Sequence, residues 1–156
     1  MKARSLTVRL AIRDDAAAIA AMSRAEIEQG LGWSWTEARV ANAIEAADKN
    51  VIVVGAPGSL VGFGIMSYAD ENAHLLLFAV AAAQRRQGVG SAMLDWLETV
   101  ARAGGVNRIA LECRRSNDAA RNFYGEHGYH EVSIARRYYR GVEDAIVLQK
   151  YLRPVE

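Results

Sequence analysis

The chain has 156 residues, of which 51% are hydrophobic and 24% are charged. The length is that of one domain, and the composition is that of a globular protein and not of an intrinsically disordered one. A formal net charge of +1 leaves no general excess of positive charge for a polyanion, so the overall charge does not indicate direct nucleic-acid binding. The single cysteine, Cys113, cannot form an internal disulfide, and nothing indicates an oxidising compartment.

We expect a cytoplasmic protein without a membrane segment, organised as one domain over residues 1–156. Charged residues interrupt the N-terminal stretch, which therefore lacks the apolar core of a signal peptide. The longest uncharged run, residues 50–69, has the length of a membrane helix but contains Gly-Ala-Pro-Gly-Ser at positions 55–59. A turn between two apolar strands fits this run better.

The first half of the chain predicts a strand, two helices and three further strands. A short strand at 7–12 precedes a helix from Asp14 to about Gln29, which the glycines at 30 and 32 end. Thr36 is a suitable N-cap for a second helix over 37–47. Strands at 51–54 and 60–66 flank the turn. The run 74–80 is apolar without alternation, which is typical of a strand buried on both faces.

The second half alternates helices and strands. An amphipathic helix follows the glycines at 88 and 90 and ends at 104–105. A strand over 108–113 places Glu112 on the face opposite Leu111 and Cys113. A helix from 116–118 to Gly128 and strands at 129–135 and 143–152 complete the chain. The resulting order, βααβββαβαββ, predicts an α/β (α+β) fold.

The segment from Phe78 to Ser91 reads as strand, basic glycine turn and helix. A helix N-terminus has unpaired N–H groups and partial positive charge, and glycines at 88 and 90 let an anion approach the backbone. Arg85 and Arg86 add positive charge. The pattern lacks the lysine of a Walker loop and the third glycine of a dinucleotide fingerprint. An ordinary strand–helix turn with two solvated arginines is the alternative.

The distribution of charge favours the anion site. Residues 85–140 carry ten arginines and six acidic residues, net +4. Residues 1–84 have net charge −2 and residues 141–156 have net charge −1. The near-neutral total therefore conceals a basic half that coincides with the glycine turn.

Three polar residues follow this turn in order. Glu112 stands in an apolar strand, where burial would raise its pKa toward that of a general base; the alternative is an ion pair with Arg114 or Arg108. Asn117 and Tyr124 are seven residues apart, on one face of a helix. The Tyr124 hydroxyl could protonate a thiolate. The alternative is a capping asparagine and a core tyrosine.

These residues resemble a known family. The turn Arg85-x-x-Gly88-x-Gly90 is similar to motif A of the GCN5-related N-acetyltransferase (GNAT) superfamily, and the order of elements is similar to its fold. The second half, over about residues 78–148, resembles the ribosomal-protein alanine N-acetyltransferase branch, whose pattern is LEVRxSNxxAxxLY followed by GF, YY and EDA. The corresponding segments here are LECRRSNDAA at 111–120, FYG at 123–125, GY at 128–129, YY at 138–139 and EDA at 143–145.

The resemblance implies a central mixed, mostly antiparallel sheet of about seven strands with about four helices. It also implies acetyl-CoA as co-substrate, with Glu112 as general base and Tyr124 as general acid. The implied cofactor-binding residues are Phe78, Ala79 and Val80 beside the pantetheine, Arg85, Arg86, Gln87, Gly88, Val89, Gly90 and Ser91 around the pyrophosphate, and Asn117 on the CoA arm. Val80 is the candidate to hydrogen-bond the thioester carbonyl.

The predicted function is transfer of an acetyl group to a primary amine, expected to be the N-terminal α-amine of a ribosomal or other protein. Acetylation of a small-molecule amine and a non-catalytic CoA-sensing module are the alternatives. Trp33, Trp35, Tyr138 and Tyr139 are candidates for the acceptor site, with core packing as the alternative for the tryptophans. His127 and His130 lack two further metal ligands, and the chemistry needs no metal. We expect a monomer or a homodimer.

Overall fold

The computed structural model describes residues 7–139 and 143–152. Its elements follow the predicted order, with two added 3-10 turns. The strands are β1 (Val8–Leu10), β2 (Lys49–Ala56), β3 (Ser59–Ala69), β4 (Asn72–Val80), β5 (Arg108–Arg114), β6 (His130–Tyr139) and β7 (Glu143–Tyr151). The helices are α1 (Ala16–Glu26), α2 (Glu37–Glu45), α3 (Val89–Ala103) and α4 (Asp118–Glu126), and the 3-10 turns are η1 (Arg13–Asp15) and η2 (Ala82–Gln84).

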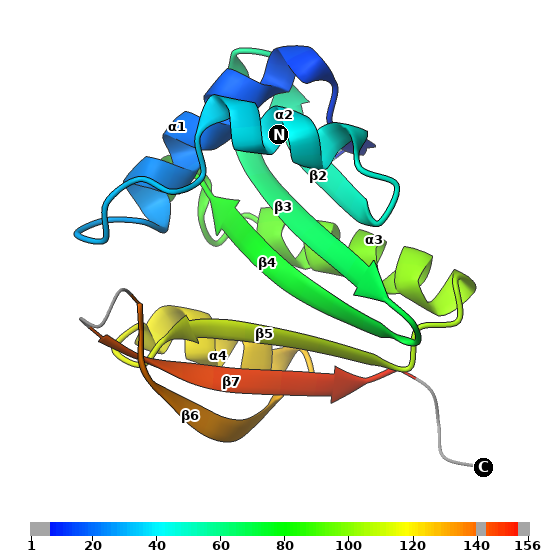
Figure 1. The fold of residues 1–156 in the computed structure, drawn as a ribbon, viewed down its shortest axis with the longest axis vertical. Coiled ribbons are helices and arrows are strands. Elements are labelled where there is room, and N and C mark those ends of the chain that lie inside the picture. Colours follow the sequence, from blue (N-terminus) through cyan, green and yellow to red (C-terminus); the bar gives the residue numbers. More distant parts are fainter. Residues whose placement is uncertain (1–6, 140–142, 153–156) are drawn as a thin grey trace.

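The described strands form one sheet in the order β1-β2-β3-β4-β5-β7-β6. Neighbouring strands are antiparallel except β4 and β5, which are parallel because α3 crosses between them. Figure 1 shows that β4 and β5 meet at one end and spread apart toward the other, so the sheet opens like a V. The predicted mixed, mostly antiparallel sheet is confirmed.

The long uncharged run, residues 50–69, forms most of the β2–β3 hairpin. Its tight turn includes Gly58, whose φ of +81° is a conformation that glycine adopts without strain. The turn interpretation is therefore confirmed. Among the described residues, no helix is long and apolar enough to cross a membrane.

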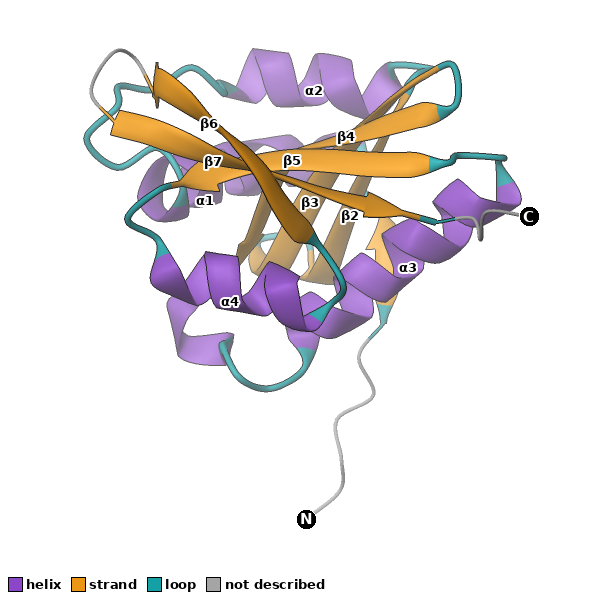
Figure 2. Ribbon diagram, turned by 90° about the horizontal axis from the view of Figure 1, so that it is seen from below, coloured by secondary structure: helices purple, strands orange, loops and turns teal. Residues whose placement is uncertain are grey.

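Helices cover both faces of the sheet (Figure 2). On one face, α1 and α2 pack on the sheet through an apolar cluster that includes Ile19, Val40 and Phe63. On the other face, α3 and α4 pack through a second cluster that includes Met93, Leu97 and Tyr124. The helices thus bury both faces of the central strands, as a sheet with a parallel crossover requires.

Strand β4 changes faces in its middle. Leu75 pairs with Met66 and Leu77 pairs with Ile65, so Leu76 is an extra residue that forms a β-bulge. Before the bulge, Leu75 lies in the α3–α4 cluster; after it, Leu77 lies in the α1–α2 cluster. A bulge shifts the side-chain alternation by one residue, which explains the exchange of faces.

The bulge coincides with the opening between the two parallel strands. Among the described residues, pairing of β4 with β5 runs from Asn72 opposite Arg108 to Leu75 opposite Leu111 and stops there. The expectation that the run 74–80 is buried on both faces is therefore wrong for part of the strand. Leu76, Phe78 and Val80 are half-buried because they border the opening.

The N-terminal strand is anchored to the start of α1 by an ion pair between a partly exposed arginine and a buried aspartate. Two guanidinium nitrogens of Arg9 donate to the two carboxylate oxygens of Asp15 at 2.8 and 2.9 Å, and the Ile12 N–H donates to the same carboxylate at 2.8 Å. Asp15 is fully buried. The hydrogen bonds from Arg9 hold the pKa of Asp15 below its usual value, although burial opposes this shift.

We predict that Asp15→Asn lowers the free energy of unfolding by about 3 kcal/mol, because it leaves Arg9 without its carboxylate. Urea unfolding at pH 7 measures this. Since the folded-state pKa is lowered, the contribution of Asp15 is present above the unfolded-state pKa of about 3.9 and is lost as the pH falls through the folded-state value. The difference between variant and wild type should therefore narrow in acid.

Glu45→Gln is the matched control, because Glu45 pairs with Arg13 at 3.4 Å on the exposed surface. We expect it to cost less than about 1 kcal/mol. Equal stabilities for Asp15→Asn and Glu45→Gln would contradict the anchoring role of the Arg9–Asp15 pair.

Candidate functional site

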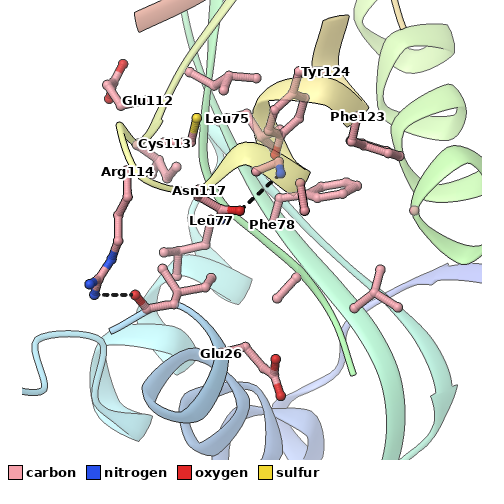
Figure 3. Close-up of a pocket in the computed structure, with 18 of the residues that line it drawn as sticks. Glu26, Leu75, Leu77, Phe78, Glu112, Cys113, Arg114, Asn117, Phe123 and Tyr124 are labelled. Atoms are coloured by element: carbon pink, nitrogen blue, oxygen red, sulfur yellow. Dashed lines mark hydrogen bonds between the residues drawn. The ribbon is translucent and has the colours of Figure 1, made fainter. Parts of the chain in front are cut away.

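A cleft of about 1030 Å³ lies where β4 and β5 separate. Its walls come from β4, β5, the glycine turn with the start of α3, α4, and the loop that follows α1. Figure 3 shows Leu77 and Phe78 on the β4 wall, with Phe123 and Tyr124 from α4 nearby. The cleft therefore lies between the parallel strands and extends from the glycine turn to the loop after α1.

Part of the β4 backbone faces the cleft and not β3. Ala81 donates its N–H to the carbonyl of Val61 on the β3 side at 2.8 Å. Because hydrogen-bonded pairs alternate along an antiparallel ladder, Ala79 also bonds to β3, whereas the peptide groups of Phe78 and Val80 point away from it. An extended ligand in the cleft could hydrogen-bond these two residues as a strand does.

The glycine turn is shaped for close approach to the backbone. Gly88 caps the N-terminus of α3 with a φ of +81°, and Arg86 also has a positive φ of +65°. A Cβ on Gly90 would come within 3.2 Å of the Phe123 ring, so a larger residue there would push against α4. The turn leaves the first N–H groups of α3 at the end of the cleft, where an anion would be stabilised.

The side chains around this turn already have partners. Arg85 donates to the Glu26 carboxylate at the end of α1 and to the carbonyl of Val80. The Ser91 hydroxyl lies 2.9 Å from Nε2 of His127, a residue that sequence reasoning considered for metal binding alone. The predicted anion site therefore combines backbone donors with an arginine that bridges to α1.

Glu112 projects from β5 on the face opposite Leu111 and Cys113, as predicted. Its Oε1 atom lies 2.7 Å from His74 Nε2 on β4 and accepts a hydrogen bond of 3.0 Å from the Tyr138 hydroxyl on β6. Tyr138 was expected to bind substrate, and it reaches the cleft through this contact. The alternative expectation was an ion pair of Glu112 with Arg114 or Arg108. Neither arginine is among the described partners of Glu112.

The expected rise in the pKa of Glu112 is wrong in sign. Burial does raise this pKa, but the hydrogen bond and charge of His74, with the bond from Tyr138, outweigh burial and lower it. Conversely, the hydrogen bond to Glu112 raises the pKa of His74 above its usual value. Burial and the neighbouring carboxylate raise the pKa of Tyr138 to about 12, so it remains a donor.

Asn117 and Tyr124 both line the cleft from α4. Asn117 is the N-cap, and its side-chain oxygen accepts the Ala120 N–H at 3.1 Å. Tyr124 is 6% exposed, and its ring packs on Phe78 with centroids 6.1 Å apart. Tyr124 belongs to the cluster that contains Leu111, whereas Glu112 points to the other face of β5, so their side chains approach the cleft from opposite sides.

The loop after α1 is held in place by two charged residues. The buried Glu28 carboxylate accepts from the Ser23 and Ser34 hydroxyls at 3.0 and 2.7 Å. Arg114 donates across the cleft to the carbonyls of Ile27 and Gln29, a contact partly visible in Figure 3. Sequence reasoning did not identify this clamp, since neither residue carries a local pattern that predicts its partner.

Of the remaining residues that were predicted to bind cofactor or acceptor, some line the cleft and others do not. Trp35 lines the cleft and is 8% exposed, with the Arg39 guanidinium 3.9 Å from its ring centroid. Trp33 is 42% exposed and is not among the described lining residues. Val89 is buried in the α3–α4 cluster, and Gln87 is likewise outside the described lining. The side chain of Tyr139 lies outside the described part of the structure.

His74 is a further residue that sequence reasoning missed. A detectable signal was present, because His74 is a polar residue at the start of an apolar strand run, as Glu112 is in β5. The parallel register places His74 opposite Ala110, two residues before Glu112 and on the same face. That register depends on the crossover through α3 and is not readable from local sequence.

The parallel strands β4 and β5 separate beside a helix that begins at a glycine cap, and the comparison with known families shows which class of protein has this arrangement. The model of the acetyltransferase (GNAT) family matches residues 17–129. The chain therefore belongs to the GNAT acetyltransferase family.

Individual relatives are similar over part of their length. The chain is 37% identical over 94 residues to an uncharacterized N-acetyltransferase of Methanocaldococcus jannaschii, a match that covers 60% of each protein. It is also 37% identical over 94 residues to the ribosomal protein bS18-alanine N-acetyltransferase of Escherichia coli, covering 58% of this chain and 64% of the relative. These matches thus span less than two thirds of the curated relatives.

Solved structures match over nearly the whole fold. Ard1 from Thermoplasma volcanium has a TM-score of 0.86 and 26% identity, covering 97% of this chain and all of that chain. The ribosomal-protein-S18-alanine N-acetyltransferase from Escherichia coli has a TM-score of 0.82 and 27% identity, covering 97% of each chain. The sheet and its helices are therefore arranged as in these two solved structures.

We predict that Cys113 resists alkylation in the folded protein. The thiol is buried in β5, and burial raises its pKa to about 11. Because the thiolate is the reactive form, iodoacetamide at pH 8 should label native Cys113 about 10²-fold more slowly than the urea-unfolded chain. Mass spectrometry of timed samples measures both rates. Comparable native and unfolded rates would contradict a packing role.

Proposed function

We propose that this chain is an acetyl-CoA-dependent N-acetyltransferase that acetylates the α-amine of a protein or peptide N-terminus. The observation that carries the proposal is the cleft between β4 and β5. It combines outward peptide groups at Phe78 and Val80, a glycine-capped helix start, and polar side chains at Glu112 and Tyr124. An extended, phosphate-bearing thioester requires these features in this spatial order.

The chemistry of the cleft fits acetyl-CoA. The peptide groups of Phe78 and Val80 would pair with the amides of the pantetheine arm, and backbone amides of residues 86–91 would bind the pyrophosphate. Gly88 adopts the left-handed conformation that begins α3, and Gly90 leaves room for the Phe123 ring beside this turn. Asn117 would contact the arm, and Val80 is the candidate donor to the thioester carbonyl. When bound, acetyl-CoA supplies an acetyl group already activated as a thioester.

Two side chains divide the proton transfers. Glu112 stands on one side of the cleft as the base that prepares the acceptor amine, directly or through one water. An α-amine has a pKa of about 7.7–8.0, so its deprotonation near neutral pH is a modest task. Tyr124 stands on the other side as the acid that protonates the leaving sulfur. Neither step requires a covalent bond to the protein.

The acceptor side favours a peptide. The Escherichia coli relative is named for a ribosomal protein alanine acceptor. In this chain, the loop after α1 is fixed by Glu28 and Arg114, and several of its residues line the cleft together with Trp35. An open wall of this kind can contact several residues behind an N-terminal amine, which a small amine does not need.

We predict that Glu112→Gln and Tyr124→Phe each lower kcat by about 10²–10³-fold, because each removes one general acid–base contribution. Both variants should bind CoA within about twofold of the wild-type Kd, since the backbone donors remain. Calorimetry measures binding and a thiol-release assay measures turnover. Wild-type turnover in both variants would contradict the assigned roles.

Glu45→Gln and Tyr151→Phe are the matched controls, because Glu45 and Tyr151 are exposed and do not line the described cleft. Both should leave kcat unchanged. If the controls lose activity to the same extent as the cleft variants, the losses reflect general damage and the assignment fails.

An acceptor screen tests the substrate class. Peptides with free N-termini, the same peptides with blocked N-termini, and small amines such as amino acids, polyamines and aminoglycosides are compared at equal concentration. We expect turnover with free N-terminal peptides and none with blocked ones. Turnover confined to small amines would move the assignment to a small-molecule acetyltransferase, and CoA binding without any turnover would indicate a sensing module.

A further inference from the structure

The acetyl transfer proposed above must dispose of one proton. An ammonium acceptor loses two protons as the N–C bond forms, and the departing thiolate takes up one as the C–S bond breaks. The second proton must reach solvent. Glu112 is poorly suited to hold this proton and carry it to solvent alone, because its environment favours the ionised form and its side chain is only 14% exposed.

His74 offers the missing connection between Glu112 and water. Its Nε2 atom lies 2.7 Å from Oε1 of Glu112, and its side chain is 40% exposed. The Tyr138 hydroxyl donates to the same Oε1 atom at 3.0 Å. With His74 and Tyr138 both on Oε1, the second carboxylate oxygen is left to face the amine or a bridging water.

We propose that His74 is a positioning residue for catalysis: it orients Glu112, shares the proton that Glu112 removes from the acceptor, and releases that proton to solvent. The inference rests on the proposed function. Since the two groups titrate in contact, the proton belongs to the pair. It resides mainly on the imidazole, which is the more basic and the more exposed partner. The pair returns to its starting state when the imidazole loses the proton to water.

The groups around His74 are few and identifiable. On the β3 side, its opposite residue is Ser67, whose hydroxyl contacts the His74 carbonyl. On the β5 side, Ala110 is opposite and Glu112 follows on the same face. Tyr138 approaches from β6 through the shared carboxylate oxygen. Within the described residues, Glu112 is thus the charged group that governs the imidazole.

His74→Gln separates proton sharing from positioning. The glutamine amide can still donate to Glu112, but it cannot take up a proton. The variant is assayed against pH with the best acceptor of the screen, and kcat/KM should fall at least about 10-fold at pH 8. His130→Gln makes the same exchange on the exposed part of β6 and should match the wild type.

The shape of the pH profile decides between the two roles. In acid, log(kcat/KM) of the wild type should fall with a slope of about two, one proton for the acceptor amine and one for the pair. In His74→Gln the slope should be about one down to roughly pH 5, because no imidazole remains to titrate and the ordinary pKa of a glutamate carboxyl is about 4.3. A rate loss with an unchanged slope of two would mean that His74 is purely structural and would overturn the proposal.

Two further readouts complete the test. Free imidazole should restore part of the activity of His74→Ala, because the exposed site leaves room for it; no restoration counts against the relay. NMR titration of the imidazole, assigned by its loss in His74→Gln, should show an elevated His74 pKa that returns toward about 6.5 in Glu112→Gln. An identical His74 pKa in both proteins would overturn the coupling even if no acceptor is found.

Failure of this inference differs from failure of the proposed function. If Glu112→Gln is inactive while His74→Gln has the wild-type rate and slope, the relay is wrong and Glu112 remains the base. If Glu112→Gln has full activity, the assignment of the base is wrong and the relay fails with it.

Discussion

The extra residue at Leu76 is the constraint on which the rest of the site depends. Without the bulge, alternate side chains of β4 would point to the same two faces along the whole strand. The bulge lies directly after Leu75, the last residue of β4 that pairs with β5. The bulge turns Leu77 into the α1–α2 cluster and places Phe78 along the opening. In an ordinary central strand, the peptide groups of this segment would hydrogen-bond to the neighbouring strand. Here they face the cleft, where a ligand can reach them.

Two parallel strands that separate leave backbone groups without a neighbouring strand. Charged side chains hold the segments on either side of this opening in place. Arg114 reaches across the cleft to carbonyls of the loop after α1, and Arg85 reaches Glu26 at the end of α1. Five arginines of the basic segment 85–140 thus have acidic or carbonyl partners among the described residues: Arg85, Arg102, Arg114, Arg115 and Arg121. What faces a bound anion is chiefly the backbone at the start of α3, with the arginines at its edge.

The fold could be predicted from the sequence because its signals are local. Thr36 caps α2 through its side chain, the Pro-Gly turn joins β2 to β3, and the glycine at 88 opens α3, each within a few residues. Glu112 and Tyr124 were found in the same way and both line the cleft. Local signals of this kind report on chain geometry and require no knowledge of distant partners.

The electrostatics of the site could not be predicted, because they depend on distant parts of the chain. The partners of Glu112 come from β4 and β6, and without them burial alone indicates a raised pKa. With these partners, the pKa of Glu112 is lowered and the pKa of His74 is raised, so His74 is the more basic of the two groups. The prediction failed in sign because desolvation is a local property of an apolar strand, whereas the compensating charge arrives through the parallel register.

Amide hydrogen exchange along β4, resolved by NMR with and without CoA, tests the central claim most directly. The account predicts that the amides of Phe78 and Val80 exchange quickly in the free protein and become protected when CoA binds. The Ala79 amide, which bonds to β3, should be protected in both states. Binding of CoA that leaves Phe78 and Val80 unprotected would show that the open edge of β4 does not receive the cofactor, and would contradict the account.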